Sequence, residues 1–397
     1  MSSGSLFEVR TRTDRSPSHA RESLIDFVNR AAGPYWDRVR EHLTVWVDQY
    51  PAQHRDDVRG RLCSRIDIDF HAAYWELFNF QVLRRAGFEL TCHPEMPGTG
   101  KRPDFLVEGH GSRFYLEAKL LGDSQEERRR QRERNQIWNE LDRRVQSEHF
   151  FVRLGVPARG HSPLPFRSLA SATTAWLAEL DVESVRRQVE LGGLVNVESF
   201  VWADERSGWS VSLSPIPKSR HSASDRLVGM GEAEAWFADD RTAIRKTLDR
   251  KSHRYGQNLD APLVVALSMG RAFVDDTDLL DALFGDEVVH VHRETMETEL
   301  GRAHNGLWLG ARGPKARGLS AVLAAKGVSP WSLGGAQLKL WVNPWAARPV
   351  DLAVPCIGAV TPRDTSIERR DAAESVLSWL NLPADWPGPE QPFDIRD

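Results

Sequence analysis

The sequence predicts a mixed α/β fold, and three observations lead to that prediction. Segments with apolar residues at helical spacing alternate along the chain with short strand-like runs. Hydrophobic residues make up 41% of the 397 residues and charged residues 27%, which is typical of a globular protein. The chain is also long enough for two domains or for one large, elaborated domain.

The N-terminal part is expected to be helical after a polar, disordered lead-in over residues 1–20. Residues 21–60 show helical patterning, which Pro51 and Gly60 interrupt. Residues 66–86 form the strongest helix candidate. This segment is apolar on nearly every side, so it is predicted to be buried.

The next segment predicts three short strands, a helix and a fourth strand. Strands are expected at 88–92, 103–109 and 112–121, and the last two form a hairpin around a Gly-His-Gly turn. A long charged helix is expected at 124–147 and a strand at 149–156. Counted from the buried helix, the order is helix, strand, hairpin, helix and strand.

The remainder predicts further helices and strands, with no internal repeat. In chain order these are a helix at 168–190, a hairpin of 193–203 and 208–216, a helix at 232–255, a buried strand at 261–269, a helix at 276–284, and strands at 287–293, 318–325 and 337–342. The Pro-rich tail from residue 384 is expected to be irregular.

Three regions follow from this pattern. They are an N-terminal helical region at 1–60, a core at 61–158 and a C-terminal α/β extension at 159–397 whose role the sequence does not indicate.

Composition and charge indicate the cell compartment of the protein and the partners that it can bind. No apolar run approaches the length of a membrane span, and the N-terminus lacks an apolar signal core. Cys63, Cys92 and Cys356 lie far apart without zinc spacing, so we expect a reducing cytoplasm and no disulfide. The net charge is −4, so a nucleic-acid partner would need a local basic surface.

Two charged side chains are predicted on one face of the strand at 112–121. Side chains alternate between the faces of a strand, so Glu117 and Lys119 point the same way, opposite to the apolar Leu116 and Leu120. A buried strand normally avoids charges, since an unpaired buried charge is costly. The pair therefore indicates a function, although a local ion pair between the two residues is the simpler structural alternative.

Asp104, at the start of the preceding strand, supplies a second carboxylate. If the two strands pair as a hairpin, Asp104 lies near Glu117, and two converging carboxylates suit Mg²⁺, with Mn²⁺ as a substitute. The metal would polarise a phosphodiester bond and activate water, and Lys119 would stabilise the developing charge. The main-chain carbonyl of Ala118 is a further candidate ligand.

The buried helix contributes a third acid. Glu76 lies among Trp75, Leu77 and Phe78, where an acid is out of character unless it serves a metal as a direct or water-mediated ligand. Asp69 is a weaker candidate on a similar face of the same helix.

Glu76, Pro103-Asp104 and Glu117-Ala118-Lys119 together resemble the PD-(D/E)xK nuclease superfamily. The resemblance covers roughly residues 65–156 and implies a restriction-endonuclease-like αβββαβ core. It implies that Asp104, Glu117 and Glu76 serve as metal ligands or accessory acids and that Lys119 is the catalytic lysine. The implied activity is Mg²⁺-dependent hydrolysis of phosphodiester bonds, in DNA rather than RNA.

Three other motifs each allow a functional and a simpler structural interpretation. Lys246, Arg250 and Arg254 share one helix face and are candidates for nucleic-acid contact, or form an ordinary basic surface. Lys251 and Tyr255 lie close by. A second set of arginines on the charged helix is either a solvated face or a phosphate track: Arg128, Arg129, Arg132 and Arg134. His290 and His292 could bind a transition metal, but no third ligand is evident.

The function predicted from the sequence is therefore a metal-dependent nuclease. The alternatives are a catalytically idle nucleic-acid-binding or scaffold module with the same core, and a structural protein with a chance motif. No helicase or methyltransferase motif is present, so a restriction, defence or repair role would need separate protein partners.

Overall fold

Two units make up the chain in the computed structural model. Unit 1 comprises Met1–Pro17, Ser23–Asp123 and Phe237–Asp397, and unit 2 comprises Ser18–Glu22 and Ser124–Trp236. The structure describes all residues except 1–4, 17, 19–21, 97–99, 122–124, 193–196, 219–226, 228–239, 256–258, 270–274, 292–297, 364–365 and 390–397.

The N-terminal part of unit 1 forms the helices and the strands that the sequence predicts. The elements are α1 (Leu24–Arg30), α2 (Pro34–Gln49), α3 (Ala52–Leu62), α4 (Asp67–Arg85), β1 (Glu89–Cys92), β2 (Phe105–Gly109) and β3 (Ser112–Leu120). His110 and Gly111 connect β2 to β3 with φ angles of 51° and 77°. Two positive φ angles in a two-residue loop match the twist of a hairpin, and glycine adopts such an angle without strain.

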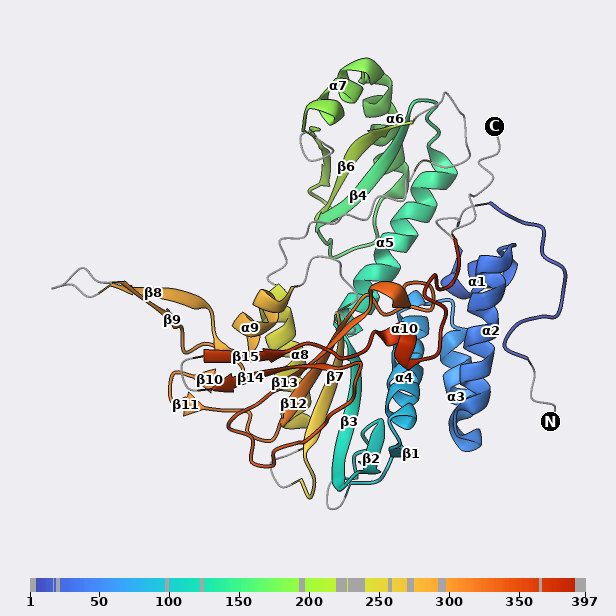
Figure 1. Cartoon of the computed structure of the whole chain (residues 1–397). Helices are drawn as coiled ribbons and strands as arrows, with labels where there is room; N and C mark the ends of the chain where they lie inside the picture. Colours follow the sequence, from blue (N-terminus) through green and yellow to red (C-terminus); the bar gives the residue numbers. More distant parts are fainter. Residues whose placement is uncertain are drawn as a thin grey trace. The chain divides into compact units, whose positions relative to one another are not determined.

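The C-terminal part of unit 1 completes one large sheet. Its elements are α8 (Asp240–Arg254), β7 (Leu263–Met269), α9 (Asp276–Phe284), β8 (Glu287–Val291), β9 (Thr298–Arg302), β10 (Leu309–Gly310), β11 (Gly313–Pro314), β12 (Ala321–Lys326), η2 (Leu333–Gly335), β13 (Gln337–Val342), β14 (Gly358–Arg363), β15 (Ser366–Arg370) and α10 (Val376–Trp379). The sheet has eight strands in the order β1-β2-β3-β7-β12-β13-β14-β15 (Figure 1). The mixed α/β class is thus confirmed.

The fourth strand beside the hairpin differs from the one that the sequence predicts. β3 pairs in parallel with β7, whose seven residues are all buried, and α8 precedes β7. The expected strand at 149–156 is β4 (Phe150–Ala158), which pairs with β6 (Trp209–Pro217) in a different sheet. The prediction that this strand completes the core sheet was wrong.

Unit 2 has its own sheet and its own core. Its elements are α5 (Gln125–Arg144), β4, α6 (Phe166–Glu179), α7 (Val182–Gly192), β5 (Phe200–Asp204) and β6, with the sheet order β4-β6-β5. The expected boundary at residue 158 does not coincide with a unit boundary, because unit 2 runs from Ser124 to Trp236.

The single helix expected at 168–190 is two helices in the structure. The reason is local: the Asp181 carboxylate accepts a hydrogen bond from the backbone N–H of Ser184 at 2.6 Å, which caps the start of α7.

The large sheet of unit 1 carries an apolar core on each of its faces. On one face Phe105 and Leu116 pack with α4 and the other N-terminal helices, and on the other Tyr115 and Val265 pack with α8 and α9. Figure 1 shows α4 and α8 on opposite sides of β3. In the described residues, no helix combines the length and the apolar character needed to cross a membrane.

Candidate functional site

The pairing of β2 with β3 sets Asp104 opposite Glu117. Phe105 is the register partner of Leu116, so the residue before Phe105 meets the residue after Leu116. One Asp104 carboxylate oxygen, Oδ2, accepts a hydrogen bond from the backbone N–H of Ala118 at 2.7 Å. The structure therefore brings together the two carboxylates that the sequence singles out.

Glu117 and Lys119 lie on one face of β3, as alternation predicts. Their register partners on the parallel strand β7 are Val265 and Leu267, and both partners belong to the core beneath α8. Leu116 belongs to the opposite core. Glu117 and Lys119 thus come from β3, and Asp104 directly precedes the neighbouring strand β2.

The protonation of Asp104 reflects its crowded surroundings. Burial raises the pKa of Asp104 well above its usual range, and the nearby carboxylates of Glu117 and Glu76 raise it further. The hydrogen bond from Ala118 and the charge of Lys251 lower it, but they do not offset these effects. The carboxyl is therefore held in its neutral form to an unusually high pH.

Three side chains at the end of α8 bind the Glu117 carboxylate, which is 4% exposed. Lys251 Nζ donates to Oε1 and Tyr255 Oη donates to Oε2. A guanidinium nitrogen of Arg254 lies 3.3 Å from Oε1. Burial and the Glu117 charge raise the pKa of Tyr255 above its usual range, so the phenol stays protonated and donates.

Glu76 lies close enough to Asp104 to raise its pKa, but its carboxylate belongs to a separate network. It is 3% exposed. Its Oε1 accepts a hydrogen bond from Tyr50 Oη at 2.6 Å, and its Oε2 pairs with Arg61 at 2.8 Å. His93 Nε2 is 4.0 Å from Oε1. Glu76 thus contacts Tyr50 and Arg61, and its role as a metal ligand or accessory acid stays a prediction.

Asp69, the weaker acid candidate, accepts a hydrogen bond from the Ser64 hydroxyl at 2.9 Å near the start of α4.

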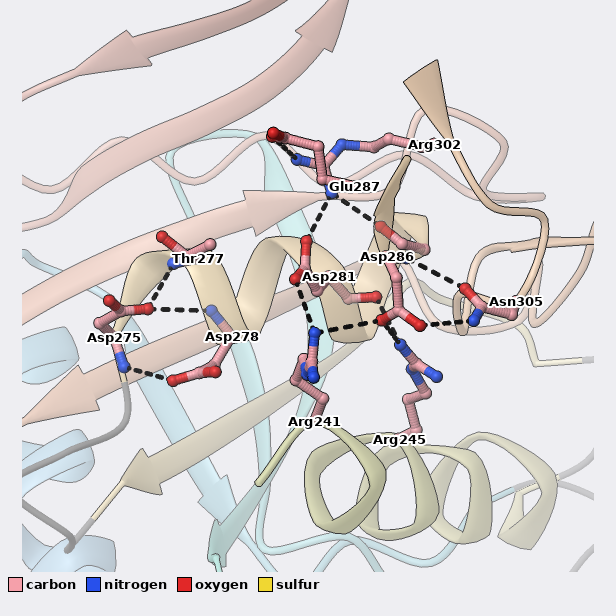
Figure 2. Close-up of polar contacts among 11 residues, drawn as sticks. Arg241, Arg245, Asp275, Thr277, Asp278, Asp281, Asp286, Glu287, Arg302 and Asn305 are labelled. Carbon is pink, nitrogen blue, oxygen red and sulfur yellow. Dashed lines mark hydrogen bonds and ion pairs between the residues drawn. The ribbon is translucent and has the colours of Figure 1, made fainter. Parts of the chain in front are cut away.

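An ionic network holds α8 against α9. Arg241 reaches Asp281 at 3.2 Å, and Arg245 reaches Asp286 at 2.6 Å (Figure 2). Asn305 donates to the other oxygen of Asp286 at 2.6 Å. The N-terminal half of α8 is thus anchored by the network, while its C-terminal end carries the side chains that bind Glu117.

The basic residues predicted for nucleic-acid contact are placed on an exposed edge of α8. Lys246, Arg250 and Arg254 are all exposed, and Arg254 also contacts Glu117. On α5, Arg129 pairs with Glu133 at 3.3 Å, which fits a solvated helix face. The side chain of Arg128 and the residue His292 lie outside the described part of the structure.

The site is only partly suited to a metal ion. Within the described part of the chain, no group of three or more His, Cys, Asp or Glu side chains is arranged to hold one. Asp104 and Glu117 do fit Mg²⁺ in their chemistry, because this ion commonly takes one or two carboxylates and keeps several waters. A bound divalent cation would also relieve the repulsion that raises the pKa of Asp104.

Sequence reasoning missed the role of Lys251 and Tyr255. The two residues are four apart, so they share a helix face, and both lie near the basic stripe. Because they share a helix face, the two side chains can contact the same partner residue. The partner itself could not be read from the sequence, because Glu117 is 134 positions away from Lys251.

The sequence matches no known family model and no curated protein, and the structure matches no solved structure.

Proposed function

We propose that this protein is a metal-dependent nuclease that hydrolyses phosphodiester bonds, with DNA as the substrate. The observation that carries the proposal is the pair of carboxylates Asp104 and Glu117, opposed on adjacent strands with Lys119 on the same face. The order α4, β1, β2, β3, α8 and β7 supports it, because this order matches the αβββαβ order that the resemblance implies, with the residues of unit 2 between β3 and α8 in the chain.

In this proposal each side chain has a distinct task. Asp104 and Glu117 would hold Mg²⁺, or Mn²⁺ in its place. The metal would supply a polarised phosphate and a more acidic bound water. Lys119 stabilises the negative charge that develops on the phosphate. The backbone N–H of Ala118 orients the Asp104 carboxylate through its hydrogen bond.

The basic edge of α8 supports a nucleic-acid substrate. The helix that binds Glu117 through Lys251 and Tyr255 also exposes Lys246 and Arg250. Cationic side chains beside two carboxylates can attract a phosphate backbone that the net charge of −4 would otherwise repel.

A second candidate function is a nucleic-acid-binding module without catalysis. It is favoured by the contacts of Glu117, whose two oxygens are already bound by Lys251, Arg254 and Tyr255. In that case the cations replace the metal and the site is a structural ion-pair cluster.

A cleavage assay separates the two functions. Supercoiled plasmid and single-stranded DNA are incubated with the protein in Mg²⁺, Mn²⁺ or EDTA. The matched variants are Asp104→Asn and Glu108→Gln, the latter changing an exposed acid of β2, the strand that Asp104 precedes. Cleavage that needs a divalent cation and is lost only in Asp104→Asn supports the nuclease. DNA binding without cleavage supports the idle module, and neither binding nor cleavage contradicts both.

The contact between Lys251 and Glu117 provides an independent test of metal binding. A metal bound by Glu117 must compete with the Lys251 ammonium. The variant Lys251→Met should therefore bind Mn²⁺ more tightly than the parent protein in a calorimetric titration. Equal affinity in the two proteins would show that Glu117 is not a ligand.

A further inference from the structure

A cavity of about 510 Å³ lies in unit 1, apart from the carboxylate pair. Its walls come from α2, from the last turns of α4 and from the segment that follows α10. The volume falls in the range of small-molecule sites, which is roughly 300–1,000 Å³. None of the residues discussed above for metal or nucleic-acid contact lines this cavity.

One wall of the cavity is aromatic and fixed in place. The ring of His42 lies 3.9 Å from that of Trp46 and 5.0 Å from that of Trp386, measured between ring centroids. His42 is held by a 3.0 Å hydrogen bond to Tyr74 Oη. The indole N–H of Trp386 donates to the carbonyl of Pro330 at 3.0 Å. Such a wall can accept a planar ring by stacking.

The rim is cationic. Arg38, Arg84 and Arg85 line the cavity and are exposed, and Glu41 is the acid among the lining residues. Arg38 pairs with Asp385 at 3.8 Å, so Arg84 and Arg85 supply the cationic charge of the rim. Within the described chain, the guanidinium groups of Arg84 and Arg85 have no hydrogen-bond or ion-pair partner. The end of α4 favours positive charge through the helix dipole, which could explain these two arginines without a ligand.

The helix dipole does not explain Gln81, which also lines the cavity. Its side chain is only 7% exposed, and its Nε2 group finds no hydrogen-bond partner among the described residues. Leaving a buried N–H group unpaired costs about 1–3 kcal/mol. A buried, unpaired donor in the wall of a cavity is accounted for if a ligand supplies the acceptor.

We propose that this cavity binds a nucleotide. The base stacks against Trp386, the phosphate pairs with Arg84 and Arg85, and the Gln81 amide donates to an acceptor on the base. The ligand is either a free nucleotide or the phosphorylated end of a strand, because both present the same groups. The proposal does not depend on cleavage by the Asp104–Glu117 pair.

Binding is tested on the full chain with the four nucleoside 5′-monophosphates. Inorganic phosphate and adenosine serve as partial ligands, and affinity is measured by calorimetry. We expect at least one nucleotide to bind tenfold or more tightly than either partial ligand. The variants Arg84→Gln and Arg85→Gln should each weaken binding about tenfold. Arg312→Gln, which changes an exposed arginine elsewhere, should leave binding unchanged.

Gln81→Leu separates a ligand-binding role from a structural one. Because the Nε2 group has no partner, the melting temperature of the ligand-free variant should equal or exceed that of the parent protein. The increase in melting temperature that the nucleotide produces should disappear. A lower melting temperature without ligand would assign Gln81 to folding and would remove the main support for the site.

A comparison of a 5′-phosphorylated oligonucleotide with the monophosphate distinguishes a strand end from a free nucleotide as the ligand. Tighter binding of a 5′-phosphorylated oligonucleotide than of the monophosphate identifies a strand end, and the reverse identifies a free nucleotide. Absence of binding by every nucleotide at millimolar concentration overturns the proposal, as does unchanged affinity in the Arg84→Gln and Arg85→Gln variants.

Discussion

At the scale of single residues, Asp104 and Glu117 differ in how they are held. The Asp104 carboxyl accepts a backbone hydrogen bond and has a raised pKa, whereas Glu117 is bound by Lys251, Arg254 and Tyr255. Replacing the carboxyl group by an amide should therefore have opposite effects on stability at the two positions.

The first prediction compares Asp104→Asn with Glu117→Gln. Because the folded pKa of Asp104 is raised, its ionisation weakens the folded state as pH rises above the usual Asp range. Asp104→Asn should therefore keep or raise the melting temperature in EDTA at neutral pH. Glu117→Gln leaves the Lys251 ammonium without its counter-charge, which costs about 3–5 kcal/mol for a buried pair. Both variants should lose metal-dependent cleavage. Equal stability of the two would contradict this assignment.

The second prediction concerns acid stability and His42. Burial lowers the pKa of His42 from 6.5 to about 3. Between these values the unfolded chain binds a proton that the folded chain does not, so the free energy of unfolding falls as pH decreases from 6.5. The slope from one such group is at most about 1.4 kcal/mol per pH unit.

Urea unfolding at pH 5 to 8 measures this effect. His42→Gln should flatten the pH dependence, although it should also lower stability at pH 8 because the ring contact with Trp46 is lost. The control His304→Gln changes an exposed histidine and should keep the slope of the parent protein. An identical slope in His42→Gln would show that other groups govern acid unfolding.

At the scale of elements, α8 packs against the core, contacts Glu117 and exposes a basic edge to solvent. Its buried face carries Ile244 and Leu248 into the core, Lys251 and Tyr255 contact Glu117, and an exposed edge carries the basic stripe.

The third prediction is that Lys246, Arg250 and Arg254 contribute to DNA binding through phosphates. Replacing all three with Ala should weaken DNA binding at low salt to a similar degree for unrelated DNA sequences. The slope of log affinity against log salt concentration should become shallower by the amount that up to about three phosphate contacts contribute. Because Arg254 also touches Glu117, the double variant Lys246→Ala/Arg250→Ala isolates the phosphate contacts. Its catalytic rate at saturating DNA should equal that of the parent protein. An unchanged salt slope would assign the stripe to solvation or to a protein partner.

The sequence predicted individual elements well because their signals are local. Alternation in β3 placed Glu117 and Lys119 on one face, and the Gly-His-Gly turn indicated the hairpin that brings Asp104 opposite Glu117. The neighbour of β3 could not be predicted, because an apolar run such as β7 has the same pattern whichever strand it joins. The strand that follows β3 directly along the chain, β4, belongs to another sheet.

At the scale of the whole molecule, the two units have separate apolar cores. Among the described residues, the core of unit 2 draws on residues from Ile137 to Leu227, and the cores on the two faces of the large sheet draw on unit 1.

The fourth prediction follows from these separate cores. Replacing residues 124–236 with a Gly/Ser linker of about 15 residues, which spans roughly 20 Å on average, should leave unit 1 folded. Its melting transition should stay cooperative and within about 5 °C of that of the parent protein, since the cores on both faces are retained. Residues 124–236 alone should give dispersed amide resonances. Aggregation of both fragments would show that each unit needs the other to fold.

The pairing of β3 with β7 and α8 also sets the order of events during synthesis. The ribosome adds about 5–20 residues per second, so the 134 positions between Glu117 and Lys251 take roughly 7–27 s to complete. Throughout that interval the edge of β3 that β7 will cover lacks its partner, and an open strand edge is a template for misassembly. Nascent chains should therefore need chaperone protection until β7 emerges.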